Sequence, residues 1–275
     1  MIVVTGATGN VGRPLVRALD AAGERVTAVS RSVSAGDVPA GVRSLRADLA
    51  RAEDLGSVFD GAKALFLLTS GDFTGSGGSV TDVLGAARAA GISRVVLLSS
   101  QGVGTGRHPS AAEDAVTGSG LDWTLLRPSG FASNALQWAE SVRTRRTVVA
   151  PFGDVALPVV DPADIAEAAA TALRDAGHTG RTYELTGPAP VSPRQQTEAI
   201  AKALGEPVRF VEQSPQEARA AMLGFMPAPV VETTLALLGT PTPAERRAAP
   251  ATGSPLLHPP RPFTAWLSRN TAPFT

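Results

Sequence analysis

The stretch Thr5-Gly6-Ala7-Thr8-Gly9-Asn10-Val11-Gly12 decides the fold of this 275-residue chain. It follows the apolar run Ile2-Val3-Val4, which is typical of a strand covered on both faces. Residues 11–22 then place apolar side chains at helical spacing. Glycines between a strand and a helix allow a tight turn, a close backbone approach to a diphosphate, and helix amides directed at negative oxygens. The stretch therefore predicts a dinucleotide-binding turn with Gly6, Gly9 and Gly12; the alternative is the same turn without a ligand.

The alternation of apolar runs and helical patterns continues to about residue 130. Strand-like runs occur at 25–30, 42–46, 64–69, 94–99 and 122–126, and helical patterns occur at 54–59 and 81–90. Strands that alternate with helices predict βαβ units, parallel pairing and right-handed crossovers. The fold class is therefore α/β: a doubly wound parallel sheet of the Rossmann type, with a smaller, irregular α/β substrate-binding portion toward the C-terminus.

Two parts of the chain follow from this pattern. Residues 1–130 form the dinucleotide-binding core, and strands near 157–160 and 182–186 return to it. Residues 131–156 and 187–275 form the substrate-binding portion, with a helix at 192–204 and a strand at 208–211. Proline is frequent from 226 to 262, so only 230–238 indicates a helix there.

The end of the second strand distinguishes between the two nicotinamide dinucleotides. An acidic residue there would bind the ribose 2′-hydroxyl of NAD, whereas arginine suits a 2′-phosphate. This position is Arg31, and no acidic residue follows until Asp37. A guanidinium offers a fork of donors and no acceptor for a hydroxyl. The expected cofactor is therefore NADP(H), and Arg13 is a candidate second cation.

Composition excludes several other classes. With 25 basic and 25 acidic residues the net charge is zero, so we expect no nucleic-acid partner and no membrane partner. There is no cysteine, and His108, His178 and His258 are widely separated, so no metal site is expected. No run of 18 apolar residues occurs, and we expect a cytoplasmic protein. The oligomeric state cannot be predicted from one sequence.

Several motifs resemble a known family. They are the stretch 5–12, Ala47-Asp48-Leu49, Ser99-Ser100, Leu126-Arg127-Pro128-Ser129-Gly130-Phe131 and the run 160–166. Together they resemble the atypical short-chain dehydrogenase/reductases, in particular the NmrA-like group with its NAD(P)H:quinone oxidoreductases. The resemblance covers roughly residues 1–205. It implies the fold and the cofactor much more specifically than the substrate.

The resemblance also implies positions around the cofactor. Thr8, Gly9, Asn10 and Val11 would hold the diphosphate, and Arg31 would hold the 2′-phosphate. Asp48 and Leu49 would flank the adenine, Leu68, Thr69 and Ser70 would line the ribose side, and Ser99, Ser100 and Gln101 would approach the nicotinamide.

The chain departs from the typical family in its proton donor. Typical members carry Tyr-x-x-x-Lys on the helix after the fifth strand, but residues 106–118 contain neither residue type. The single tyrosine, Tyr183, lies on a later strand, and we expect it in the core. A simple ketone needs a positioned acid, whereas a reduced quinone is an anion that ordinary hydrogen-bond donors stabilise. The remaining candidates for catalysis are Ser100, Gln101 and His108, with an exposed loop histidine as the alternative for His108.

Aromatic residues outside the parallel sheet suggest the substrate class. The candidates for substrate binding are Phe131, Asn134, Trp138, Phe152 and Phe225, and each has core packing as its alternative. An aromatic lining suits a flat, apolar small molecule. The sequence thus predicts an NADPH-dependent reductase of a quinone, enone or polycyclic aromatic ketone. The alternative is a non-catalytic NADP(H)-sensing regulator of the NmrA type that binds a partner protein.

Overall fold

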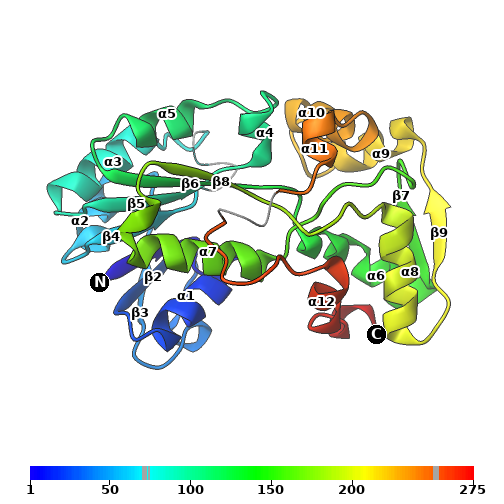
Figure 1. Ribbon diagram of the computed structural model, residues 1–275, viewed down its shortest axis with the longest axis horizontal. Helices are drawn as coiled ribbons and strands as arrows, with labels where there is room; N and C mark the ends of the chain where they lie inside the picture. Colours follow the sequence, from blue (N-terminus) through cyan, green and yellow to red (C-terminus); the bar gives the residue numbers. More distant parts are fainter. Residues whose placement is uncertain (70–72, 74, 250–253) are drawn as a thin grey trace. The chain divides into compact units, whose positions relative to one another are not determined.

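The computed structural model in Figure 1 describes residues 1–69, 73, 75–249 and 254–275. The chain divides into two compact units. Unit 1 contains the described residues of Met1–Pro128 and Pro162–Leu185, together with 254–258. Unit 2 contains Ser129–Asp161, residues 186–249 and Pro259–Thr275. Each unit is therefore assembled from three separate stretches of the chain.

Among the described residues of unit 1, seven strands form one sheet in which all neighbouring pairs are parallel. The strands are β1 (Ile2–Thr5), β2 (Val26–Ser30), β3 (Arg43–Arg46), β4 (Ala64–Leu67), β5 (Arg94–Leu98), β6 (Asp122–Pro128) and β8 (Arg181–Leu185). Their order is β3-β2-β1-β4-β5-β6-β8. The order reverses between β1 and β4, which is where open α/β sheets bind ligands. The predicted doubly wound Rossmann sheet is confirmed.

Helices cover both faces of this sheet. Figure 1 shows α1 (Gly12–Ala21) and α7 (Pro162–Arg174) side by side on one face. The opposite face carries α2 (Ala52–Phe59), α3 (Val80–Ala89) and α5 (Ala111–Thr117), while α4 (Gln101–Gly104) directly follows β5. The central strands are apolar on both faces because both are covered: Val3 and Val4 of β1 have no exposed surface. Two single turns, η1 (Ala35–Asp37) and η3 (Ala176–His178), complete the unit.

The two returning strands that the sequence suggested have different outcomes. β8 pairs with β6 in the register Leu126↔Tyr183 and so extends the sheet near 182–186. The segment 157–160 forms only isolated bridges, Phe131↔Val160 and Leu157↔Val191, and it belongs to unit 2. Pro158 has no N–H to donate to a ladder, which disfavours a regular strand there. The expectation that this segment returns to the sheet is therefore wrong.

Unit 2 is mostly helical. β7 (Thr147–Ala150) and β9 (Arg209–Glu212) form a parallel pair. The helices are η2 (Ala132–Trp138), α6 (Ala139–Arg145), α8 (Pro193–Leu204), α9 (Pro215–Leu223), α10 (Ala228–Gly239), α11 (Pro243–Arg246), α12 (Phe263–Ser268) and η4 (Ala272–Phe274). A hydrophobic core that includes Val142, Ile200 and Trp266 holds these elements together.

Prolines begin helices in unit 2 more often than they interrupt them. Ser192, Ser214 and Thr242 are N-caps whose side chains accept from the third backbone amide of the helix, and a proline follows each of them. A glutamine or glutamate at the third position completes a capping box. The proline-rich region therefore contains more helix than the sequence pattern indicated.

No helix in the described parts of the chain is both long and apolar enough to cross a bilayer. Over the same residues, no group of three or more histidine, aspartate or glutamate side chains is arranged to hold a metal ion.

Candidate functional site

A cleft of about 410 Å³ lies at the carboxyl ends of the first four strands of unit 1. All of its lining residues come from the segments that follow β1, β2, β3 and β4, or from the last residues of those strands. They are Thr5, Gly6, Thr8, Gly9, Val29, Ser30, Arg31, Ser32, Ala47, Asp48, Leu49, Leu68, Thr69 and Phe73. The cleft thus occupies the point where the strand order reverses.

Each of the three glycines of the first loop has a different structural requirement. Gly6 has φ +63°, and a Cβ there would lie 2.5 Å from Leu68 Cδ2. A Cβ at Gly12 would lie 2.1 Å from the Gly6 carbonyl oxygen, so Gly12 lets α1 begin directly against the loop. A Cβ at Gly9 would meet only that same oxygen, at 3.2 Å. Gly6 and Gly12 are therefore required by the loop itself, while Gly9 keeps backbone open toward the cleft.

Side-chain hydroxyls fix the ends of the strands around this loop. The Thr5 hydroxyl accepts a hydrogen bond from the Leu68 amide at 2.7 Å and lies 3.0 Å from the Phe66 carbonyl oxygen. The Thr8 hydroxyl donates to Ser30 Oγ at 3.2 Å. These contacts join the first loop to the segments after β4 and β2. The cleft wall is therefore formed before any ligand binds.

The arginines near the cleft have different surroundings. Arg13 lies 3.6 Å from the Asp37 carboxylate and donates to the Thr8 carbonyl oxygen at 2.8 Å. Hydrogen bonds from the Ser34 side chain and backbone lower the pKa of Asp37 despite some desolvation, and the charge of Arg13 adds to this effect. Asp37 thus offsets the charge of Arg13. Arg31 is exposed and lines the cleft, where a 2′-phosphate would require a cation.

The structure places the other expected cofactor residues as follows. Gly6, Thr8, Gly9, Arg31, Asp48, Leu49, Leu68 and Thr69 line the cleft, whereas Asn10, Val11, Gly12 and Ser99 are not among its lining residues. Val11 and Gly12 are buried at the start of α1. Ser70 lies outside the described residues. Six further residues line the cleft that were not candidate cofactor residues: Thr5, Val29, Ser30, Ser32, Ala47 and Phe73. Ser30 and Ser32 flank Arg31 and could have been inferred from it.

At the end of β5, Ser99 is engaged in a buried polar cluster. Its hydroxyl donates to the carboxylate of Glu113 on α5, and Arg127 of β6 donates to the same carboxylate at 2.9 Å and 2.5 Å. Burial alone would raise the pKa of Glu113, but the hydrogen bonds from Arg127 and Ser99 outweigh it, and this pKa is lowered. The bond to Glu113 raises the pKa of Arg127. Both side chains are therefore held in their charged forms.

The next two residues face different partners. Ser100 Oγ lies 2.7 Å from Nδ1 of His108, and His108 is exposed. Gln101 is 7% exposed, and its Nε2 has no hydrogen-bond partner among the described residues. Buried amide donors normally have an acceptor, so Gln101 is available to a ligand or a water molecule.

The residue types of the usual dyad lie away from this strand end. Tyr183 is half-buried on β8, and its hydroxyl lies 2.8 Å from Nδ1 of His178. Desolvation raises the pKa of Tyr183, which makes it a weaker acid than an exposed tyrosine. Lys63 and Lys202 are exposed.

The expected substrate-binding residues all belong to unit 2. Trp138 is 8% exposed and is part of the hydrophobic core, so packing accounts for it. Phe131 and Phe152 are half-buried, and Phe152 adopts φ +55°. Its ring leaves no room for a side chain at Gly239, where a Cβ would lie 2.7 Å from Phe152 Cζ. Asn134 is exposed, and Phe225 is 73% exposed.

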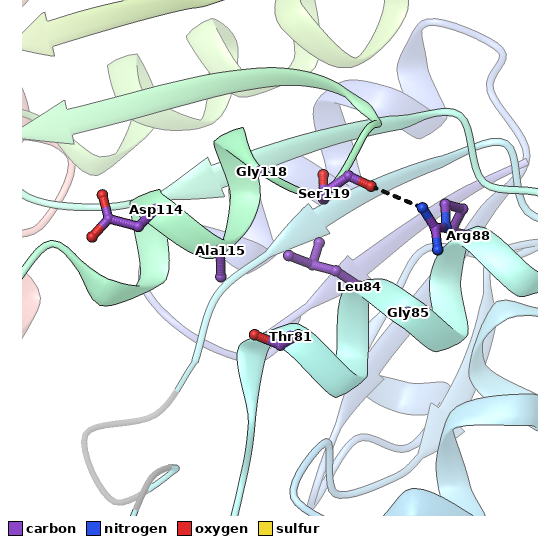
Figure 2. Close-up of a pocket in the computed structure, with 8 residues that line it drawn as sticks. All are labelled: Thr81, Leu84, Gly85, Arg88, Asp114, Ala115, Gly118 and Ser119. Atoms are coloured by element: carbon purple, nitrogen blue, oxygen red, sulfur yellow. Dashed lines mark hydrogen bonds between the residues drawn. The ribbon is translucent and has the colours of Figure 1, made fainter.

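A second cavity, of about 370 Å³, lies between α3 and α5 (Figure 2). In Figure 2, Leu84 lies between the two helices, and Arg88 reaches the Ser119 carbonyl oxygen. The Asp114 carboxylate points away from the other labelled side chains. None of the residues of the first cleft lines this cavity. It contains no cluster of side chains suited to catalysis.

A parallel sheet with a glycine-rich first loop and a cleft at the strand reversal defines a dinucleotide-binding protein. Residues 6–176 match the model of a family described as NAD(P)H-binding. The chain belongs to this NAD(P)H-binding family and is an oxidoreductase.

Two curated relatives and one solved structure show the extent of the likeness. A (4-alkanoyl-5-oxo-2,5-dihydrofuran-3-yl)methyl phosphate reductase of Streptomyces griseus subsp. griseus is 35% identical and covers 100% of this chain and 99% of its own length. An NAD(P)H azoreductase of Xenophilus azovorans is 30% identical, over 82% of this chain and 81% of its own. The Escherichia coli quinone oxidoreductase QOR2, solved with NADPH, superposes with a TM-score of 0.80 at 24% identity, over 98% of this chain and 99% of its own.

The residues of the cleft fit the cofactor that the family implies. The loop 6–9 leaves space beside Gly9 that a Cβ would fill, which suits a diphosphate. Arg31, Ser30 and Ser32 supply donors at the end of β2, and Leu49 supplies an apolar surface at the end of β3. Together these groups match the phosphate, ribose and adenine parts of a dinucleotide.

Proposed function

We propose that this chain is an NADPH-dependent reductase that transfers hydride to an electron-poor conjugated acceptor: a quinone, an enone or a polycyclic aromatic ketone. The observation that carries this proposal is the combination of two features: the cleft with Arg31 on its wall, and a strand end that presents Ser100 and Gln101 and is followed by a segment without the tyrosine of typical relatives. The cleft with Arg31 selects the cofactor. The donors at the strand end restrict the class of acceptor.

Bound NADPH supplies the hydride. The loop at Gly6 to Gly9 would hold the diphosphate, and Arg31 would bind the 2′-phosphate through a charge-assisted fork. Asp48 and Leu49 would flank the adenine, and Leu68 and Thr69 would line the ribose. The Asp48 carboxylate accepts from the Ala50 amide at 3.1 Å, so this part of the wall is held in place by the chain itself.

The acceptor class follows from the acidity that the product requires. Hydride addition to an isolated ketone gives a strongly basic alkoxide, which needs a positioned acid. Hydride addition to a quinone or to a conjugated double bond gives a phenolate or an enolate, whose charge is delocalised over oxygen and carbon, and hydrogen-bond donors are enough to stabilise it. Tyr183 lies on β8, where its hydroxyl contacts His178, so the donors at the end of β5 are a serine and an amide. These donors suit the delocalised anion.

The names of the relatives support the same class. The substrate named for the Streptomyces griseus relative is a 5-oxo-2,5-dihydrofuran with an alkanoyl group, in which the ring double bond is conjugated to two carbonyl groups. The azoreductase is named for an N=N acceptor. Each of these acceptors can hold the negative charge that hydride brings.

A panel of acceptors tests the proposal. Purified protein is mixed with NADPH or NADH and with a benzoquinone, a cyclic enone, an unsaturated lactone or a plain cyclic ketone, and the absorbance of the reduced nicotinamide is followed. We expect oxidation of NADPH with at least one conjugated acceptor and none with the plain ketone. Tight NADP⁺ binding without turnover on any acceptor would contradict the proposal and support the NADP(H)-sensing alternative.

A further inference from the structure

Ser100 and His108 form a hydrogen-bonded couple at the edge of the sheet that carries the cleft. Ser100 is the N-cap of α4 in an extended conformation, immediately after β5. β5 pairs with β4 in parallel, so Ser100 lies at the same edge as the cleft residues Leu68 and Thr69. Its Oγ is 2.7 Å from His108 Nδ1, so each group can donate to or accept from the other.

Gly102 makes this couple possible. The amides of Arg107 and His108 both donate to the Gly102 carbonyl oxygen, at 2.8 Å and 3.0 Å, and this closes the chain after α4 into a tight turn. The imidazole then folds back over α4. A Cβ at Gly102 would lie 2.5 Å from His108 Nδ1 and 2.7 Å from its Cε1, so any other residue would push the ring away from Ser100.

The neighbouring side chains leave Ser100 as the hydroxyl that remains for a ligand. Ser99 donates to Glu113, whose carboxylate is also bound by Arg127, and this buried cluster is satisfied internally. Ser100, by contrast, is bound to the imidazole of His108, which is exposed to solvent. Gln101 Nε2, buried without a partner among the described residues, adds a fixed donor beside it. Ser100, His108 and Gln101 thus place a hydroxyl, an imidazole and an amide donor at this strand end.

We propose that Ser100 and His108 are the proton-delivering couple of this reductase, in place of a tyrosine–lysine pair; the inference rests on the proposed function. The acceptor gains a hydride, with its two electrons, and one proton. Ser100 Oγ–H gives the proton to the oxygen that becomes negative, and His108 Nδ1–H replaces it on Oγ. The step requires His108 to begin as the imidazolium, with a proton on each ring nitrogen, so that it is left neutral with Nε2–H and then regains the Nδ1 proton from water. Ser100 is the catalytic residue, and His108 and Gly102 are positioning residues.

Three variants test the couple, with His178→Gln as the matched control for loss of an imidazole elsewhere in unit 1. Ser100→Ala should lower kcat on the best acceptor by about 100-fold or more, because a positioned proton donor contributes at least that much. His108→Ala should lower kcat by about tenfold or more, and added imidazole should restore that variant but not Ser100→Ala. KM for NADPH should stay within about twofold in each case, since the substituted groups act on the proton and not on the cofactor.

Gly102→Ala tests the position of the His108 ring while both Ser100 and His108 are kept. Alanine is a better helix former than glycine, so we expect no loss of thermal stability, but its methyl group should displace the imidazole. The chain has three histidines, so nitrogen NMR on the protein without cofactor can assign their ring nitrogens. The His108 Nδ1 signal should show a hydrogen bond in the wild type and lose it in both Gly102→Ala and Ser100→Ala.

The outcomes distinguish this inference from the proposed function. If the wild type reduces acceptors while His108→Ala and Ser100→Ala stay within about twofold of its kcat, the couple is not the proton donor although the reductase assignment stands. A failure of imidazole to rescue His108→Ala would likewise overturn the relay. If the wild type reduces no acceptor, the proposed function fails, and the NMR experiment shows separately whether the couple forms.

Discussion

Gly9 and Gly12 occupy the same loop three residues apart, yet methyl groups added to them would meet different surroundings. At Gly12 the methyl would overlap the Gly6 carbonyl oxygen at 2.1 Å, whereas at Gly9 the same oxygen is 3.2 Å away and no other atom is close. Gly12→Ala should therefore destabilise the protein by about 2–3 kcal/mol and also weaken cofactor binding. Gly9→Ala should cost less than about 1 kcal/mol but raise the NADPH dissociation constant more than about tenfold, because the methyl fills space next to the diphosphate.

Urea unfolding and fluorescence titration with NADPH measure the two effects separately. Equal destabilisation by both substitutions would contradict this division of roles. Unchanged NADPH affinity in Gly9→Ala would show that the diphosphate does not approach this part of the loop.

Arg31 should determine the preference between the two dinucleotides. It lines the cleft at the end of β2, while the charge of Arg13 is already offset by Asp37 at 3.6 Å. Arg31→Ala should weaken NADP⁺ binding about 10–100-fold and leave NAD⁺ binding nearly unchanged, since a charge-assisted hydrogen bond contributes about 1.5–3 kcal/mol. Calorimetric titration with both nucleotides measures this. Arg17, exposed on α1, provides the control substitution, and an equal loss of both nucleotides in Arg31→Ala would contradict the assignment.

At the scale of secondary-structure elements, one carboxylate joins three of them. Glu113 of α5 binds Ser99 after β5 and Arg127 of β6, and its side chain is 6% exposed against 24% for Arg127. Removing the arginine leaves a buried charge, whereas removing the carboxylate leaves a cation that reaches water. Arg127→Leu should therefore destabilise by about 3 kcal/mol and Glu113→Gln by about 2 kcal/mol or less. Denaturant unfolding at neutral pH compares them, and the reverse order would contradict the burial argument.

The same carboxylate predicts a pH dependence of stability. The folded state lowers the pKa of Glu113 below its ordinary value of 4.5, so the folded protein binds fewer protons than the unfolded chain near that pH. The contribution of Glu113 to the free energy of unfolding is complete above pH 4.5. It is lost as the pH falls through the pKa that Glu113 has in the folded state. Unfolding free energies measured from neutral pH down to acid should fall more steeply for the wild type than for Glu113→Gln. Parallel curves would show that Glu113 has the same pKa in both states.

How far an element could be predicted from the sequence depends on whether its signal is local. The turn at 5–12, the alternating strands and the arginine at the end of β2 are local patterns, so the sheet and much of the cleft follow from them. Two prolines of unit 2, Pro215 and Pro243, misled because each follows an N-cap, Ser214 or Thr242, and so begins a helix. A search for capping boxes would have found these helices.

Contacts across the sequence could not be predicted in this way. Glu113 and Arg127 are 14 residues apart on a helix and a strand, and no spacing rule pairs them. Ser100 and His108 were separate candidates, but their contact depends on the turn that Gly102 permits. The segment near 157–160 has the apolar composition of a strand. It forms only isolated bridges in unit 2, because strand formation depends on tertiary contacts as well as on composition.

At the scale of the whole molecule, the pairing of β6 with β8 has a consequence for biosynthesis. β6 ends at Pro128 and its partner begins at Arg181, with the Ser129–Asp161 stretch of unit 2 between them in the chain. While a ribosome adds those intervening residues, one edge of the nascent sheet has donors and acceptors that no neighbouring strand satisfies. Another nascent chain on the same messenger could dock there. We therefore expect the β6 edge to stay open to pairing with other strands until residues 181–185 have been synthesised.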